Sequence, residues 1–150
     1  MSFTDWLKKN VTGAKDALNT EIGKFKSRDL LEAVVAGSVV VAYADGQVTP
    51  DEKQKLMGYL KISDQLKVFD SGDVIKIFQK YAEKFEFDVA IGTGEAMQAI
   101  AKFKGKPQAQ LVVRVCCAIA AADGDFDQKE RAVVRKMCSE LGLNPADFEL

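Results

Sequence analysis

The sequence contains no histidine, and this absence narrows what its 150 residues can do. Without histidine there is no Ser-His-Asp or Cys-His nucleophile pair, no imidazole base and no ligand for the commonest zinc sites. Carboxylate chemistry remains possible for acid and base work. We therefore expect a protein that binds rather than catalyses, and we predict that the chain is not an enzyme.

Excess charge of one sign is also missing. The chain has 21 basic and 22 acidic residues, a formal net charge of −1. Because a generic nucleic-acid binder carries a strongly basic surface, we expect no nucleic-acid partner. The three cysteines, Cys116, Cys117 and Cys138, are odd in number and form no C-x-x-C motif. This usage predicts no disulfide framework and indicates a reducing compartment.

Long hydrophobic runs are absent as well. The longest ones cover residues 33–44 and 115–122. Both are far shorter than the roughly 20 apolar residues that span a bilayer. The first ten residues, MSFTDWLKKN, lack the apolar stretch of a signal peptide. We expect a soluble, cytoplasmic protein.

Proline is scarce, and each proline stands where a helix can begin: Pro50, Pro107 and Pro145. Between them, apolar residues recur at spacings of three and four, which is typical of helices. One stripe consists of Val74, Ile77, Phe78, Tyr81 and Phe85, with Asp70 able to cap the start of its helix. Another runs through Val89, Ala96, Ile100 and Phe103. The β-branched residues 39–41 suit a strand, but the same pattern recurs downstream among alanines, so we predict a helix there too. The chain is predicted to be all-α.

An internal repeat organises the sequence. The tripeptide Ala-Asp-Gly occurs at 44–46 and again at 122–124, and the flanking residues match in kind. Two copies of a three-helix unit can pack about a pseudo-two-fold axis. We predict one domain, residues 1–150, built as a bundle of about seven helices. Its parts are repeat one (about 10–62), a connecting helix (about 70–85), repeat two (about 88–141) and a short C-terminal helical turn (145–150).

Carboxylates mark the ends of the apolar helices in both repeats. Asp45 and Asp123 continue the apolar stripes before them, and Glu52 and Glu130 share faces with the apolar residues after them. A partly desolvated carboxylate costs free energy unless it is paired, hydrogen-bonded or bound to metal. Carboxylates without histidine or thiolate partners suit a hard cation, so we predict a site for Ca²⁺, Mg²⁺ or Mn²⁺.

The second turn adds Asp125 and Asp127, which alternate with Asp123 as the first ligands of an EF-hand loop do. The rest of that loop is missing, because Gln128 replaces the turn glycine and Val134 the closing glutamate. The turn is therefore not an EF-hand. The first turn is less charged, and we expect it to bind metal more weakly.

Helix capping is the competing interpretation of the same residues. Thr49-Pro-Asp-Glu52 is a capping box, and Asp127-x-x-Glu130 is its aspartate version. The Asp-Gly pairs fit helix C-termini that end in a left-handed glycine. Under this hypothesis the carboxylates only stabilise helix ends, and no metal binds.

At these residues the sequence resembles the tellurite-resistance TerB family. The matching pieces are the two Ala-Asp-Gly turns with glutamate six residues after each glycine, together with EKQKLMGYLKISDQLKVFD, FEFDVAIGTGEAM and LGLNPADFEL. The resemblance covers essentially the whole chain. It implies a TerB-like helical fold, a non-enzymatic role in tellurite resistance, and metal binding at Asp45, Glu52, Asp123 and Glu130. It also implies partners within that resistance system, including membrane-embedded and calcium-binding proteins.

Two further segments leave alternatives open. Residues 1–28 form a basic amphipathic pattern with six basic and three acidic residues, which suits either packing in the core or peripheral attachment to the inner membrane. The three cysteines suit either a thiol reaction with tellurite or burial as small apolar side chains. We favour packing and burial, because free cysteine is usually buried.

Overall fold

The computed structural model describes residues 28–45, 48–50, 53–54, 57–58, 69–122, 128–148 and 150. These residues form helices and no strand, so the all-α prediction is confirmed for this part of the chain. Five α-helices are described: α3 (Arg28–Ala42), α5 (Ser71–Phe87), α6 (Val89–Ala101), α7 (Gln108–Ala122) and α8 (Gln128–Leu141). Two 3₁₀ turns, η2 (Tyr43–Asp45) and η3 (Pro145–Phe148), follow α3 and α8.

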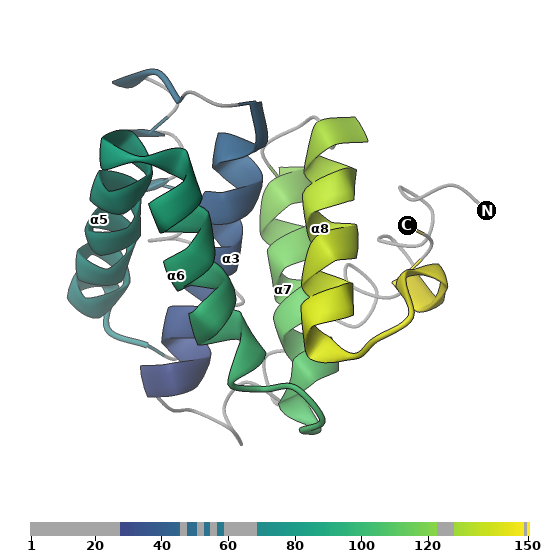
Figure 1. Ribbon diagram of the computed structural model, residues 1–150. Helices are drawn as coiled ribbons and strands as arrows, with labels where there is room; N and C mark the ends of the chain where they lie inside the picture. The colour runs from purple at the N-terminus through teal and green to yellow at the C-terminus, as the bar shows by residue number, and fades with distance from the viewer. Residues whose placement is uncertain are drawn as a thin grey trace.

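Helix α3 lies at the centre of the bundle (Figure 1). It packs against α5, α6, α7 and α8. Its sequence explains the position: apolar side chains occupy almost every side of the helix, and such a helix is stable only when surrounded. The run of residues 39–41 is helical as predicted, because burial on all sides outweighs the strand preference of valine.

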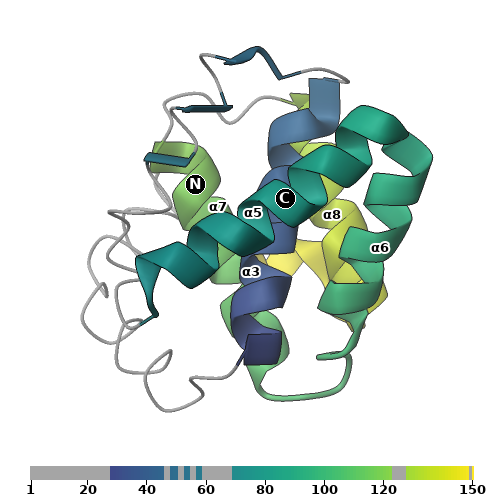
Figure 2. The same ribbon diagram turned by 90° about the vertical axis from the view of Figure 1, so that its left-hand side faces the viewer.

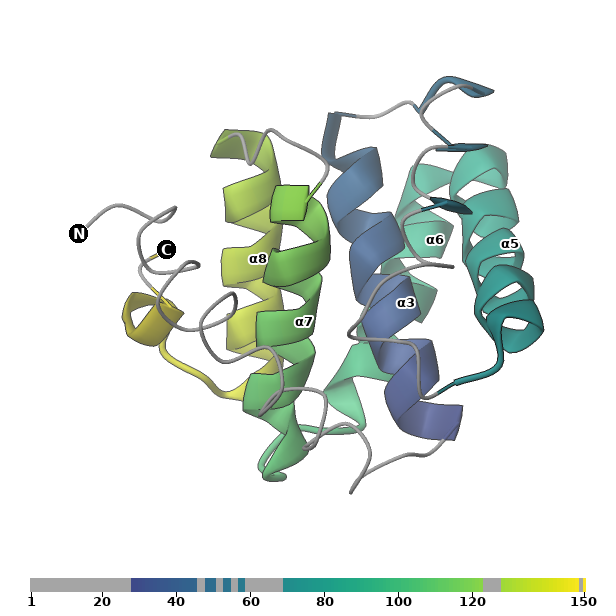
Figure 3. The same ribbon diagram turned by 180° about the vertical axis from the view of Figure 1, so that it is seen from behind.

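Two antiparallel helix pairs flank α3. Figures 1 and 3 show the α5–α6 pair on one side and the α7–α8 pair on the other, and Figure 2 shows α5 crossing in front of α3. The core-facing residues predicted for the connecting helix are buried in α5: Val74, Ile77, Phe78, Tyr81 and Phe85. Asp70 caps this helix as predicted, with Oδ1 accepting hydrogen bonds from the N–H groups of Gly72 (2.8 Å) and Asp73 (3.3 Å).

Local signals also end α8 and begin the helical turn that follows it. Gly142 has a φ of +73°, and the N–H of Leu143 donates to the carbonyl oxygen of Cys138, which closes the helix with a left-handed glycine. Pro145 then opens η3, and Asn144 caps it by accepting a hydrogen bond from the N–H of Ala146. The predicted C-terminal helical turn is therefore present, over residues 145–148.

The structure tests the predictions for α6 and for the internal repeat only in part. The stripe from Val89 to Phe103 is predicted to face the core, and Ala96, Ile100 and Phe103 are buried. Val89 is 46 % exposed instead, because it opens α6, whose first three residues are all exposed. Helices α3 and α7, which the repeat pairs, do pack against each other. The leading helix of repeat one and most of residues 50–62 lie outside the described residues. The count of seven helices, the pseudo-two-fold axis and the domain bounds therefore remain predictions.

None of the described helices is both long enough and apolar enough to span a bilayer.

Candidate functional site

The first acidic turn is held between the two repeats. Asp45 closes η2, directly after the central helix α3, and η2 packs against α8. Glu130 lies in the first turn of α8 and is partly buried. The ends of α3 and α7 and the start of α8 all lie at one end of the bundle (Figures 1 and 3). The two elements in contact, η2 and α8, thus each carry one predicted ligand, one from each repeat.

Tyr43 fixes η2 in place from the other side. Its hydroxyl donates a hydrogen bond to Glu86 Oε1 of α5 (3.1 Å), and its ring stacks on Phe85 with centroids 5.1 Å apart. Burial, together with the Glu86 carboxylate, raises the pKa of Tyr43 to about 12, so the hydroxyl stays a donor at neutral pH. Lys53 forms an ion pair with the same Glu86. The turn that carries Asp45 is therefore attached to both α5 and α8.

The remaining predicted ligands lie outside the described residues: Glu52, Asp123, Asp125 and Asp127. Within the residues that the structure describes, no three acidic, cysteine or histidine side chains gather into a metal site. The donors that the turns offer are carboxylates, which suit a hard cation. The contact of η2 with α8 joins two elements that each carry a predicted ligand, and the metal site itself remains a prediction.

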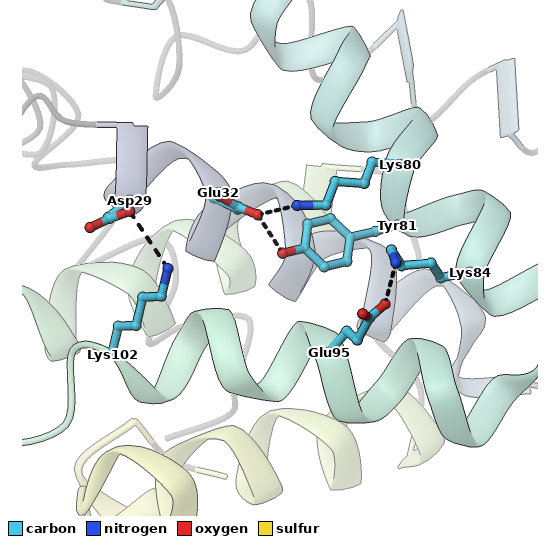
Figure 4. A network of polar contacts seen from close by, with 7 residues as sticks. All are labelled: Asp29, Glu32, Lys80, Tyr81, Lys84, Glu95 and Lys102. Atoms are coloured by element: carbon cyan, nitrogen blue, oxygen red, sulfur yellow. Dashed lines mark hydrogen bonds and ion pairs between the residues drawn. The ribbon is translucent and has the colours of Figure 1, made fainter.

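A second cluster of polar side chains, which we call the Glu32 network, joins α3, α5 and α6 (Figure 4). Glu32 Oε1 accepts hydrogen bonds from Lys80 Nζ and from the Tyr81 hydroxyl, both at 2.7 Å. Ion pairs join Lys84 to Glu95 (2.6 Å) and Lys102 to Asp29 (3.7 Å). Sequence analysis did not predict this network, because its partners are far apart in the chain and each side chain alone resembles ordinary surface charge.

The network borders a pocket of about 170 Å³. The residues that line it are Glu32, Lys80, Tyr81, Glu95, Gln98, Ala99 and Lys102. Two lysines balance two glutamates, and each of these four charges already has a partner of opposite sign in the network. This arrangement connects the three helices and leaves no net charge to attract an ionic ligand. We therefore assign the Glu32 network a structural role.

Glu32→Gln is expected to lower the free energy of unfolding by about 1–2 kcal/mol at pH 7, because Lys80 and Tyr81 lose a charged acceptor. The hydrogen bond from Lys80 holds the pKa of Glu32 below its ordinary value of 4.5. The unfolded state therefore binds the proton more readily, and the contribution of Glu32, present above pH 4.5, is lost as pH falls. Urea unfolding at pH 7 and pH 4 measures both effects.

Glu83→Gln is the matched control for this prediction. Glu83 is exposed on the same helix, α5, and its substitution should change the free energy of unfolding by no more than about 0.5 kcal/mol. If the Glu32 and Glu83 variants are equally stable at pH 7, the structural role of the network is wrong.

Similarity to known proteins identifies the family of the chain. The profile of the family described as "Tellurite resistance protein TerB" matches residues 31–150. The chain belongs to the TerB family. A relative from Alcaligenes sp., named "Tellurium resistance protein TerB", is 40 % identical over 116 residues, which cover 77 % of this chain and 95 % of the relative. No solved structure matches.

The region that matches the TerB family contains the predicted metal ligands. All six predicted ligands lie within residues 31–150, whereas the basic segment 1–28 lies before the matched region. Both acidic turns therefore belong to the part of the chain that TerB proteins share.

The cysteines of this TerB chain are buried, as predicted. Cys116, Cys117 and Cys138 all have no exposed surface, and all three are free. Burial raises the pKa of Cys116 to about 12 and that of Cys138 to about 11, and it raises the pKa of Cys117 as well. Because the thiolate is the reactive form, these buried thiols are poor nucleophiles at neutral pH. The described geometry thus does not favour thiol chemistry with tellurite.

Proposed function

We propose that this TerB-family chain serves tellurite resistance as a non-enzymatic binding module of the cytoplasm. It takes up a divalent cation at its acidic turns and docks other proteins of the resistance system, including membrane-embedded ones. The observation that carries the proposal is the packing of η2, with Asp45, against α8, with Glu130. This contact supports a cation that joins the two repeats.

Within the proposal, each repeat supplies oxygen ligands. Asp45 and Glu52 come from the first repeat, and Asp123 and Glu130 from the second. Asp125 and Asp127 add negative charge to the second turn, which we expect to bind the cation more tightly. A bound Ca²⁺, Mn²⁺ or Mg²⁺ supplies positive charge that offsets the repulsion between these carboxylates. The hydrogen bond from Tyr43 to Glu86 limits how far the first turn can move.

Titration calorimetry tests the metal-binding part. We expect heat from Ca²⁺ or Mn²⁺ with the unmodified protein and none with the double variant Asp45→Asn Asp123→Asn. The control Asp70→Asn Asp73→Asn also removes two carboxylates, but from the exposed start of α5, where asparagine still caps the helix. It should bind like the unmodified protein. If none of Ca²⁺, Mn²⁺ and Mg²⁺ produces heat with the unmodified protein, the proposal is contradicted.

A purely structural module, in which the carboxylates only cap helices, is the competing function. One contact favours it: the Lys53 N–H donates to the Thr49 carbonyl oxygen (2.9 Å), so a helical turn begins where the capping box predicts. The two functions differ in their response to metal. Under the capping hypothesis the melting temperature is the same with cation and with chelator, whereas a bound cation raises it.

A further inference from the structure

Three large apolar side chains are exposed within five residues of one another where α5 turns into α6. We call Phe87, Val89 and Ile91 the apolar corner; they are 81 %, 46 % and 48 % exposed. Among the described residues they are the exposed large hydrophobic side chains, and they lie within five positions of one another. Single exposed apolar residues are ordinary, but a local group of them is typical of an interaction site.

The corner is rigid, because Asp88 caps both helices. Its N–H donates to the Lys84 carbonyl oxygen at the end of α5 (3.0 Å), and its Oδ1 accepts from the Ile91 N–H at the start of α6 (3.1 Å). Gly92 then lies directly against Phe85, where an added Cβ meets the Phe85 Cα at 2.8 Å. The backbone that carries Phe87 is therefore held by both helices, so docking there requires little ordering of the main chain.

Acidic side chains surround the apolar corner. Residues 83–95 contain four carboxylates and one lysine, and that lysine is paired with Glu95. Glu83 and Asp88 are exposed beside the corner, whereas Glu86, also exposed, is already paired with Lys53. This negative rim repels an anionic lipid surface and attracts a basic partner. The described residues include no strand, so no sheet edge is available for backbone pairing, and recognition rests on side chains.

We propose that the apolar corner docks a basic amphipathic segment of a partner protein. The apolar face of the segment covers Phe87, Val89 and Ile91, and its lysines or arginines face the surrounding carboxylates. This inference rests on the docking part of the proposed function and is independent of the acidic turns. Phe87 is the expected anchor, since interface energy concentrates in central aromatic residues.

The probe for this proposal is a short designed peptide whose leucines and lysines follow helical periodicity, compared with the same peptide carrying glutamate for lysine. Fluorescence anisotropy should show binding of the lysine peptide alone. Phe87→Ser should weaken it about tenfold or more. Gln98→Ser, at an exposed position outside the corner in α6, should leave it unchanged. Glu83→Gln Asp88→Asn should weaken it several-fold and reduce its dependence on salt.

Several outcomes overturn the proposal. The first is that the lysine peptide does not bind, and the second is that it binds the Phe87→Ser variant with unchanged affinity. The third is that the unmodified protein binds vesicles of phosphatidylcholine with phosphatidylserine and Phe87→Ser abolishes this binding. The fourth is that the unmodified protein self-associates and Phe87→Ser abolishes the self-association. Because Phe87 is 81 % exposed, its substitution should not alter the melting temperature. Peptide binding and metal calorimetry on the unmodified protein separate the two proposals: metal heat without peptide binding removes only the docking site, and peptide binding without metal heat removes only the cation site.

Discussion

Gly92→Ala should destabilise the protein by about 2–3 kcal/mol. A Cβ at this position meets Phe85 at 2.7 Å from Cγ and at 2.8 Å from Cα. Phe85 is buried in the core, and its Cα belongs to α5, so neither atom can yield without moving the helix. The closest approach of α5 and α6 therefore depends on the missing side chain. Urea unfolding followed by circular dichroism measures the loss.

Gly94→Ala, two residues further along the same helix, is the matched control. An added Cβ has no neighbouring heavy atom within 4 Å, and Gly94 is exposed. Alanine removes the entropic cost of glycine in a helix, so this variant should be about 0.5–1 kcal/mol more stable than the unmodified protein. Similar effects at the two positions would mean that α6 does not pack on α5 as described.

Gly37→Ala should also lower the free energy of unfolding, by about 1–3 kcal/mol. Gly37 lies in the central helix α3, and a Cβ there lies 2.5 Å from Cys116 Sγ of α7 and 3.4 Å from Met137 Cε of α8. The Cys116 side chain is short and fully buried, so it has no free space to occupy. This contact joins the two helices that the sequence repeat pairs.

The double variant Gly37→Ala Cys116→Ala tests the cause. Removing the sulfur opens the space that the new methyl group needs. The double variant should therefore lose at least about 0.5 kcal/mol less than the two single variants combined. Additive losses would show that the destabilisation arises elsewhere than in the contact of α3 with α7.

Much of the fold could be predicted because its signals are local. The apolar periodicity from Val74 to Phe85, the cap at Asp70 and the turn at Pro145 each depend on neighbouring residues, and the structure confirms them. The central position of α3 follows from its apolar character on all sides. These features need no knowledge of which helices meet.

Contacts between distant residues could not be predicted in this way. Glu32 and Lys80 are 48 positions apart, and nothing in either local sequence indicates that they pair. Gly92 weakens α6 by helix propensity, yet its lack of a side chain is what lets α6 approach Phe85. Tertiary packing determines both positions.

The candidate metal site depends partly on local sequence and partly on contacts between distant residues. Spacing alone identified the carboxylates of both turns, because each turn is a local pattern. The packing of η2 on α8 is a contact between repeats, and the structure supplies it for the elements that carry Asp45 and Glu130. The other four predicted ligands lie outside the described residues, so their place in a site remains a prediction.

Paramagnetic broadening by Mn²⁺ is the most direct measurement of the central claim, that a divalent cation binds at the acidic turns. In amide NMR spectra, substoichiometric Mn²⁺ should broaden signals of η2, Tyr43–Asp45, and of the first residues of α8, from Gln128 to Glu130. Signals of residues 102–106, between α6 and α7 at the opposite end of the bundle, should stay sharp (Figure 1). Asp45→Asn Asp123→Asn should abolish the selective broadening. Equal broadening at both ends of the bundle, or none at η2 and α8, contradicts the claim.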